Sequence, residues 1–180
     1  YFDEEIEGNF NVTLAKRQPG SSIKPYVYAS AFQKGYRPET IVFDLPTQFS
    51  TACEPWDMSN ESPCYAPKNY NGKYVGPLSL RNALAQSLNI PAVKVLYLTG
   101  LKDAIKLAGD MGITTLNDPD RLGLTLVLGG GEVTLLEHTG GYAVFANEGV
   151  KAKRRAILKI EDINGNVIEE TPEESTRVME

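Results

Sequence analysis

Histidine and cysteine are scarce in this sequence. His138 is its only histidine, and Cys53 and Cys64 are its only cysteines. A structural zinc site is usually built from four cysteine or histidine ligands. The sequence therefore predicts no zinc site.

The two cysteines flank a polar, turn-rich loop, EPWDMSNESP. A disulfide between Cys53 and Cys64 would contribute roughly 2–3 kcal/mol for a loop this short. Two free thiols agree with the sequence equally well. The cysteines permit an oxidising compartment without requiring one.

Long apolar runs and an excess of positive charge are also missing. No segment approaches the ~20 apolar residues of a membrane span, and the first stretch, YFDEEIEGNF, is acidic, unlike a signal peptide. An export signal or anchor would therefore lie outside this chain. With a net charge of −5 and no basic cluster, we expect no binding to nucleic acid. The composition, 42% hydrophobic and 23% charged, is that of one globular core.

The first periodic segment is Ser21–Phe32, where apolar residues recur at helical spacing. Proline is tolerated only near a helix start, so Pro25 places the start at Ser21 or Ser22. Lys34-Gly35 supplies a stop signal. Residues 35–77 are rich in Pro, Asn, Tyr and Gly, which predicts a long irregular segment.

Further helices are predicted in the middle of the chain. Ser79 is placed to cap a helix, Pro91 breaks or restarts it, and Gly100 ends the second piece. Residues 101–112, LKDAIKLAGDMG, have the pattern of another short amphipathic helix.

The last third of the sequence mixes both kinds of element. Residues 122–131, LGLTLVLGGG, are expected to be extended and then glycine-rich, and Thr134 with Glu137 forms a capping pair that opens a helix. Residues 156–170 are typical of a β-hairpin that turns at Asn164-Gly165. The final EESTRVME has the pattern of a helix start. The fold class is α+β.

A Ser-x-x-Lys, Ser21 to Lys24, carries the candidate chemistry. A serine hydroxyl is a poor nucleophile until a base takes its proton, and residues three apart at a helix start lie on one face. Lysine can be that base only if its pKa is lowered. First-turn N–H groups can hold an acyl oxyanion. The alternative is a helix cap beside a solvated lysine, because such a short motif also arises by chance.

A second motif, Ser87-Leu88-Asn89, lies just before Pro91. Read alone, it could equally cap the end of a helix. However, RQPGSSIKP, NYNGKYVGPLSLRNALAQSLNIPAVKV and LGGGEVTLLEHTGGYAVFANEG resemble, in order and spacing, the transpeptidase domain of class A penicillin-binding proteins. The resemblance extends over nearly the whole chain.

The resemblance implies a role for each motif residue. Ser21 would attack the penultimate D-Ala carbonyl of a peptidoglycan stem peptide, and Lys24 would activate it. Ser87 would relay a proton toward the leaving amine, and Asn89 would hold substrate backbone and help to position Lys24. β-Lactams would acylate the same serine. The family needs no metal or organic cofactor.

The resemblance also implies that the chain is incomplete. The family carries a Lys-Thr-Gly or Lys-Ser-Gly on a strand, and neither occurs here. His138-Thr139-Gly140 has helical rather than strand spacing, so His138 is predicted to be an ordinary helical side chain. We expect residues 1–180 to form a single partial transpeptidase domain, the helix-rich portion of the fold with a C-terminal hairpin and most of the central antiparallel sheet missing. Such a piece would be inactive when isolated.

By the same resemblance, the parent protein would be anchored in the bacterial membrane, act on its extracytoplasmic face and carry a glycosyltransferase domain outside this chain. Two other functions stay open: a penicillin-recognising sensor module, and an inactive scaffold. A class A β-lactamase is disfavoured because no Glu-x-x-Leu-Asn stretch is present.

Overall fold

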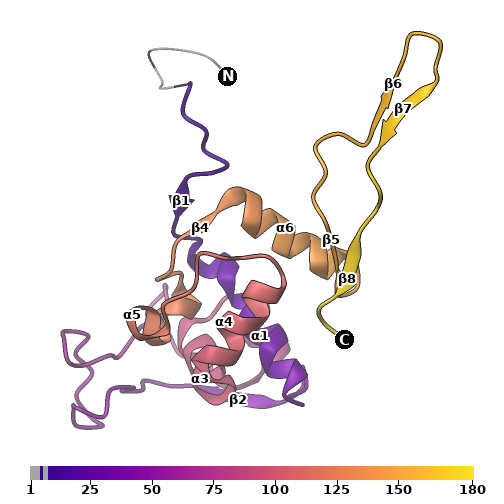
Figure 1. Ribbon diagram of the computed structural model, residues 1–180. Coiled ribbons are helices and arrows are strands. Elements are labelled where there is room, and N and C mark those ends of the chain that lie inside the picture. The colour runs from indigo at the N-terminus through magenta and orange to yellow at the C-terminus, as the bar shows by residue number, and fades with distance from the viewer. Residues whose placement is uncertain (1–4, 6–7) are drawn as a thin grey trace.

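A computed structural model describes residue 5 and residues 8–180. Residues 1–4 and 6–7, part of the acidic stretch YFDEEIEGNF, lie outside the described residues. Helices form the body of the molecule (Figure 1). In chain order they are the 3-10 helix η1 (Gly20–Ile23), α1 (Lys24–Gln33), α2 (Leu80–Ala85), α3 (Asn89–Thr99), α4 (Leu101–Asp110), α5 (Pro119–Leu122), the 3-10 helix η2 (Gly123–Leu128) and α6 (Leu135–Ala146).

The core lies around α1 and α3, which pack directly against each other. Both helices are apolar on most sides, the pattern of helices covered by neighbours all round. Each fully buried large apolar side chain contributes roughly 1.5–3 kcal/mol. Their buried apolar side chains are Tyr26, Val27, Tyr28, Ala29 and Ala31 in α1 and Ile90, Ala92, Val93, Val95 and Leu96 in α3.

The strands of the described residues form four small antiparallel sheets of two strands each. The pairs are β1 (Lys16–Arg17) with β4 (Val133–Thr134), β2 (Ile41–Asp44) with β3 (Gly76–Ser79), β5 (Val150–Ala152) with β8 (Ser175–Arg177), and β6 (Lys159–Glu161) with β7 (Val167–Glu170). Within the described residues no sheet is larger. The predicted α+β class, helix-rich with a C-terminal hairpin, is confirmed.

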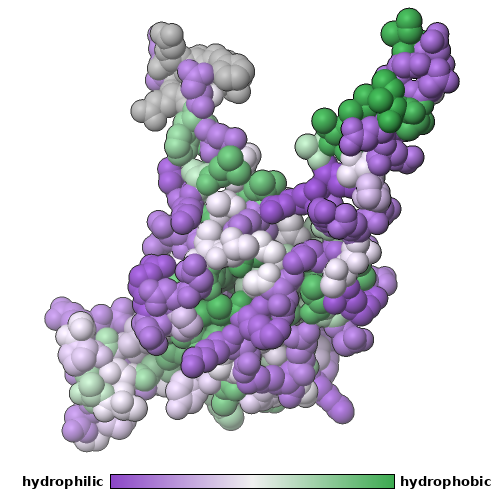
Figure 2. All heavy atoms as spheres, in the orientation of Figure 1, coloured by the Kyte–Doolittle hydropathy of each residue, from purple (hydrophilic) through white to green (hydrophobic). Residues whose placement is uncertain are grey.

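The β6–β7 hairpin projects away from the helical body (Figure 1). Its turn contains Gly165 at φ +84°, as the Asn164-Gly165 pair predicted. Apolar side chains cover much of the projecting arm, seen as green spheres in Figure 2. They include Ile157, Leu158, Ile163, Val167 and Ile168, all exposed. None of the helices in the described residues is long and apolar enough to cross a membrane.

Most predicted helices are confirmed, except that α1 begins at Lys24, after the 3-10 helix η1, and not at Ser21 or Ser22. The caps of the confirmed helices explain their bounds. Ser79 accepts a hydrogen bond from the Asn82 N–H at the start of α2, and Gly100, at φ +92°, ends α3. At the start of α6, only one of the two hydrogen bonds of the predicted capping pair forms. Thr134 Oγ1 accepts from the Glu137 N–H, but the Glu137 carboxylate turns to Thr114.

Three other predictions were wrong. Residues 35–77 are not wholly irregular, because β2 lies within them and pairs with β3. LGLTLVLGGG folds as α5 and η2 rather than an extended run, which buries Leu126 and Val127. The C-terminal segment forms strand β8, not a helix start, because Ser175–Arg177 finds a partner in β5.

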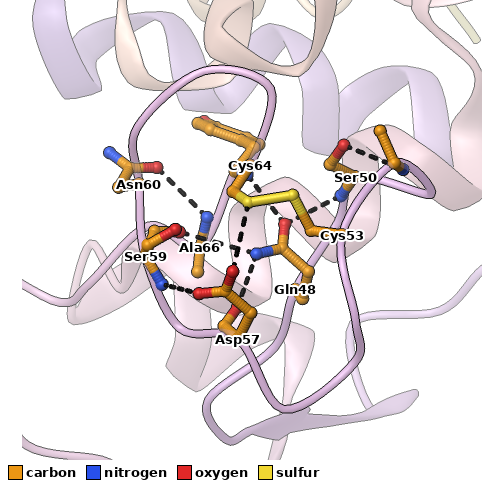
Figure 3. Close-up of a disulfide and its surroundings, with 10 residues drawn as sticks. Gln48, Ser50, Cys53, Asp57, Ser59, Asn60, Cys64 and Ala66 are labelled. Atoms are coloured by element: carbon orange, nitrogen blue, oxygen red, sulfur yellow. Dashed lines mark hydrogen bonds between the residues drawn. A yellow bond between two sulfur atoms is a disulfide. The ribbon is translucent and has the colours of Figure 1, made fainter.

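Cys53 and Cys64 form a disulfide, which decides the alternative that the sequence left open (Figure 3). The Gln48 side chain reaches into the loop between the two cysteines, where its amide donates to the Asp57 carbonyl at 2.6 Å. Asp57 also lies beside both sulfurs. Disulfide sulfurs are not thiolates, so these three residues do not form a metal-binding set.

Candidate active site

Ser21 lies in the 3-10 turn η1, immediately before α1. Its side chain is exposed, and its carbonyl accepts the Lys24 N–H. The serine is not a capping residue, since Pro19 precedes η1 and Ile23 precedes α1, with no side-chain cap at either. Among the described residues the Ser21 hydroxyl has no hydrogen bond, to Lys24 or to any other group. The Ser21 hydroxyl is therefore available to bind a ligand.

Lys24 is the first residue of α1, and only 1% of it is exposed. Its amine donates to the Ser87 carbonyl at 2.6 Å, the Ser87 hydroxyl at 3.2 Å and Asn89 Oδ1 at 2.8 Å. These three acceptors match the three N–H groups of an ammonium ion. Burial lowers the pKa of Lys24 from 10.5 to about 8, and no carboxylate in the described residues forms an ion pair with it.

The turn between α2 and α3 brings Ser87 and Asn89 to Lys24. Ser87 has φ +53°, a left-handed conformation that is uncommon outside glycine. The α2 helix ends at Ala85, with Gln86 as its C-cap residue, and Leu88 precedes α3 without a side-chain cap. The alternative that Ser87 and Asn89 serve only as a helix cap is therefore not supported. Their side chains face the lysine instead.

Lys68 and Asn69, which no sequence pattern singled out, form hydrogen bonds with Asn89 on the side away from Lys24. The Lys68 carbonyl accepts from Asn89 Nδ2 at 2.9 Å, and Asn69 Oδ1 accepts from the Asn89 backbone N–H at the same distance. Asn69 lies in one of the segments that carry the resemblance, but no motif or periodicity singled it out. Only its burial, at 4% exposed, reveals a structural role.

His138 lies in α6, as its helical spacing predicted. Its environment was not predicted, because its Nε2 is 2.8 Å from the Ser22 hydroxyl, one residue from Ser21. The ring packs against Tyr26 and Tyr142, and the Tyr142 hydroxyl donates to the Ser22 carbonyl. Burial lowers the pKa of His138. The histidine thus packs against the turn that carries Ser21.

Gly129 supports the same turn from the other side. It ends η2 at φ +93°, and a Cβ there would collide with the Gly20 backbone, next to Ser21. We expect Gly129→Ala to lower the free energy of unfolding by more than the roughly 1–2 kcal/mol of a left-handed alanine. Gly35, also at φ +93° but with open space around it, is the matched control. Equal losses in chemical denaturation of the two variants would contradict this close packing.

Comparisons with known proteins agree with this geometry. Residues 9–180 match the family described as the penicillin binding protein transpeptidase domain. Penicillin-binding protein 1A of Rickettsia bellii is 36% identical over 157 residues, 87% of this chain and 19% of the relative. Penicillin-binding protein 2D of Bacillus subtilis is 37% identical over 169 residues, 93% of this chain and 23% of the relative.

A solved structure shows the same fold. The crystal structure of penicillin-binding protein 1A from Haemophilus influenzae has a TM-score of 0.78 and 29% identity, covering 94% of this chain and 24% of that one. The chain spans about a fifth of the length of these relatives. Both sequence and fold lead to one assignment. This chain belongs to the transpeptidase domain family of the class A penicillin-binding proteins.

Proposed function

We propose that this chain is part of a peptidoglycan D,D-transpeptidase that forms an acyl-enzyme on Ser21. The observation that carries the proposal is the buried Lys24 amine, joined to Ser87 and Asn89 and one helical turn from an exposed serine. A general base works best with a pKa near the working pH. With a pKa of about 8, about a tenth of Lys24 is neutral at pH 7, enough to accept a proton.

The proposed reaction begins with acylation of Ser21. Neutral Lys24 takes the proton of the Ser21 hydroxyl as the serine oxygen bonds to the penultimate D-Ala carbonyl carbon. The C–N bond to the terminal D-Ala then breaks. The leaving amine receives the proton from Lys24 through the Ser87 hydroxyl, to which Lys24 donates. First-turn N–H groups near Ser21 supply part of the oxyanion hole.

Deacylation completes the cross-link. The amine of a second stem peptide attacks the ester carbonyl, the new C–N bond forms, and the bond to Ser21 breaks. The proton lost by that amine returns to the serine oxygen, with Lys24 as carrier. Asn89 binds substrate backbone and keeps its oxygen on Lys24. Neither step needs a metal or an organic cofactor.

β-Lactams are the second class of ligand in this proposal. Their strained amide takes the place of the D-Ala-D-Ala bond, so opening the ring leaves a penicilloyl ester on Ser21. The names of the two relatives above, both penicillin-binding proteins, support this ligand. We further propose that the parent is membrane-anchored, works on the extracytoplasmic face of the bacterial membrane and is linked to a glycosyltransferase domain outside this chain.

We also propose that residues 1–180 form one partial transpeptidase domain with the first and second motifs. A third motif, Lys-Thr-Gly or Lys-Ser-Gly, is absent from the sequence. Its strand would supply the other half of the oxyanion hole and bind the substrate carboxylate. On this proposal the isolated chain is inactive, and the full-length protein that contains it is the active species.

The test is covalent labelling of the full-length protein by a fluorescent penicillin, combined with release of D-Ala from a stem peptide ending in D-Ala-D-Ala. We expect both, with the adduct on the peptide that contains Ser21. Labelling without D-Ala release from the peptide would favour a sensor module. A full-length protein that accepts no label would be an inactive scaffold, and the proposal would fail.

A further inference from the structure

Behind the candidate site lies a buried pair, Asp44 and Asn69. Asp44 is fully buried at the end of β2, and Asn69 follows the disulfide-closed loop. The Asn69 side-chain amide donates to both Asp44 carboxylate oxygens, at 2.8 and 2.9 Å, and to the Lys73 carbonyl at 2.9 Å. Its oxygen accepts from the backbone N–H of Asn89 at 2.9 Å. A chain of hydrogen bonds thus leads from a buried carboxylate to the second motif.

The segment 68–69 fixes Asn89 at two points, and this decides which way its side chain faces. The Lys68 carbonyl can only accept a hydrogen bond, so the NH₂ group of Asn89 must be the end that faces it, at 2.9 Å. The oxygen of Asn89 is therefore directed at Lys24 Nζ, 2.8 Å away. If 68–69 moved, the amide of Asn89 could turn and present N–H groups to the ammonium.

The carboxylate of Asp44 strengthens this arrangement. It has no ion pair in the described part of the chain. Its hydrogen-bond donors are the Asn69 amide and the Val75 N–H, 3.0 Å from Oδ2, and it also interacts electrostatically with the Lys94 amine. Burying a charge without an ion pair in contact is costly, so a neutral core residue would cost less for folding alone. A charged acceptor polarises the Asn69 amide and makes its oxygen a better acceptor. That oxygen caps the positive N-terminal end of α3.

We propose that Asp44 and Asn69 are positioning residues for this active site. They hold Asn89 in the orientation in which its oxygen accepts from Lys24, and so hold the base beside Ser21. The inference rests on the proposed function, because it concerns acylation of Ser21. Neither residue has a part in the proposed reaction. Their effect passes through Asn89.

The test measures the rate of acylation by a fluorescent penicillin in the full-length protein. We expect Asn69→Ala to lower this rate by about 10- to 100-fold, because small displacements of reacting groups have effects of that size. Asn71→Ala is the matched control. Asn71 lies in the same segment, is exposed, and its side chain accepts only from the Lys73 N–H. This variant should be acylated at the wild-type rate.

An exchange of the acid and the amide separates positioning from simple loss of folding. Asn69→Asp places two carboxylates side by side and should slow acylation at least as much as Asn69→Ala. Adding Asp44→Asn restores one acid and one amide, with the acid now accepting from Asn89. The bond from position 69 to the Lys73 carbonyl is not restored, so the rescue should be partial. We expect the double variant to be acylated about tenfold faster than Asn69→Asp alone. Circular dichroism gives the folded fraction of each variant, to which rates are normalised.

The outcomes are distinct. If the wild type is acylated on Ser21 and both Asn69→Ala and Asn69→Asp match it per folded molecule, the positioning role is wrong and the proposed function stands. A double variant no faster than Asn69→Asp also contradicts the pairing. If Asn69→Ala does not fold, the exchange still decides the matter. Failure of the wild type to be acylated overturns both proposals together.

Discussion

Replacing Ser21 by alanine is expected to reduce penicillin labelling of the full-length protein below detection. The acyl-enzyme needs an oxygen to carry the ester, and alanine has none, so the loss should be on the order of 10⁶-fold in acylation rate. Stability should change little, since the Ser21 side chain is exposed and has no hydrogen bond in the described residues. Gel fluorescence after exposure to labelled penicillin, with a thermal midpoint for each protein, measures both effects.

Ser22→Ala is the matched control for this prediction. Ser22 lies in the same turn, and its hydroxyl donates to the Pro19 carbonyl at 2.6 Å and lies 2.8 Å from His138 Nε2. A serine paired with a histidine is itself a familiar arrangement for a nucleophile, so the alternative has to be tested. We expect Ser22→Ala to keep its label. Loss of label in Ser22→Ala with retention in Ser21→Ala would move the nucleophile to the Ser22–His138 pair.

Local signals were enough to predict the helical body. Pro25 limited where the first helix could begin, Ser79 and Thr134 marked helix starts, and Gly100 marked an end. These signals work because each depends on a few neighbouring residues. The two motifs were also visible, because the family resemblance connected segments 66 positions apart in the sequence. The contact of the second motif with Lys24 depends on the tertiary structure, and the spacing of the motifs in the sequence could not predict it.

What the sequence did not predict depends on contacts between distant residues. Strand β2 was not predicted because its four residues, Ile41–Asp44, are too few to show a clear alternation of apolar and polar side chains. The strand is defined by its pairing with β3. Residues 122–131 read as extended, yet the core needs Leu126 and Val127 buried, and a 3-10 helix places them there. Asp44 and Asn69 are ordinary loop-type residues in the sequence. Their role emerges only when both are buried behind Asn89.

The second large effect is expected at Lys24. Lys24→Met keeps most of the side-chain volume but removes the base, so acylation of Ser21 should slow by about 10²–10⁴-fold. Stability should not fall in parallel, because the buried ammonium carries a desolvation cost that methionine lacks. Stopped-flow acylation and thermal unfolding of the same protein test the two parts. A variant that is acylated at the wild-type rate would exclude Lys24 as the base.

The pH dependence gives the same assignment an independent check. Burial lowers the pKa of Lys24 to about 8, so the neutral amine, and with it the acylation rate, should increase as pH rises through about 8 and then level off. The unfolded chain, with a lysine pKa near 10.5, binds more protons than the folded one between these values. Folding stability attributable to Lys24 should therefore increase with pH across that window. Lys24→Met should lose this contribution, and with it the rise in rate near pH 8. A wild-type profile flat from pH 6 to 9 would mean that another group activates Ser21.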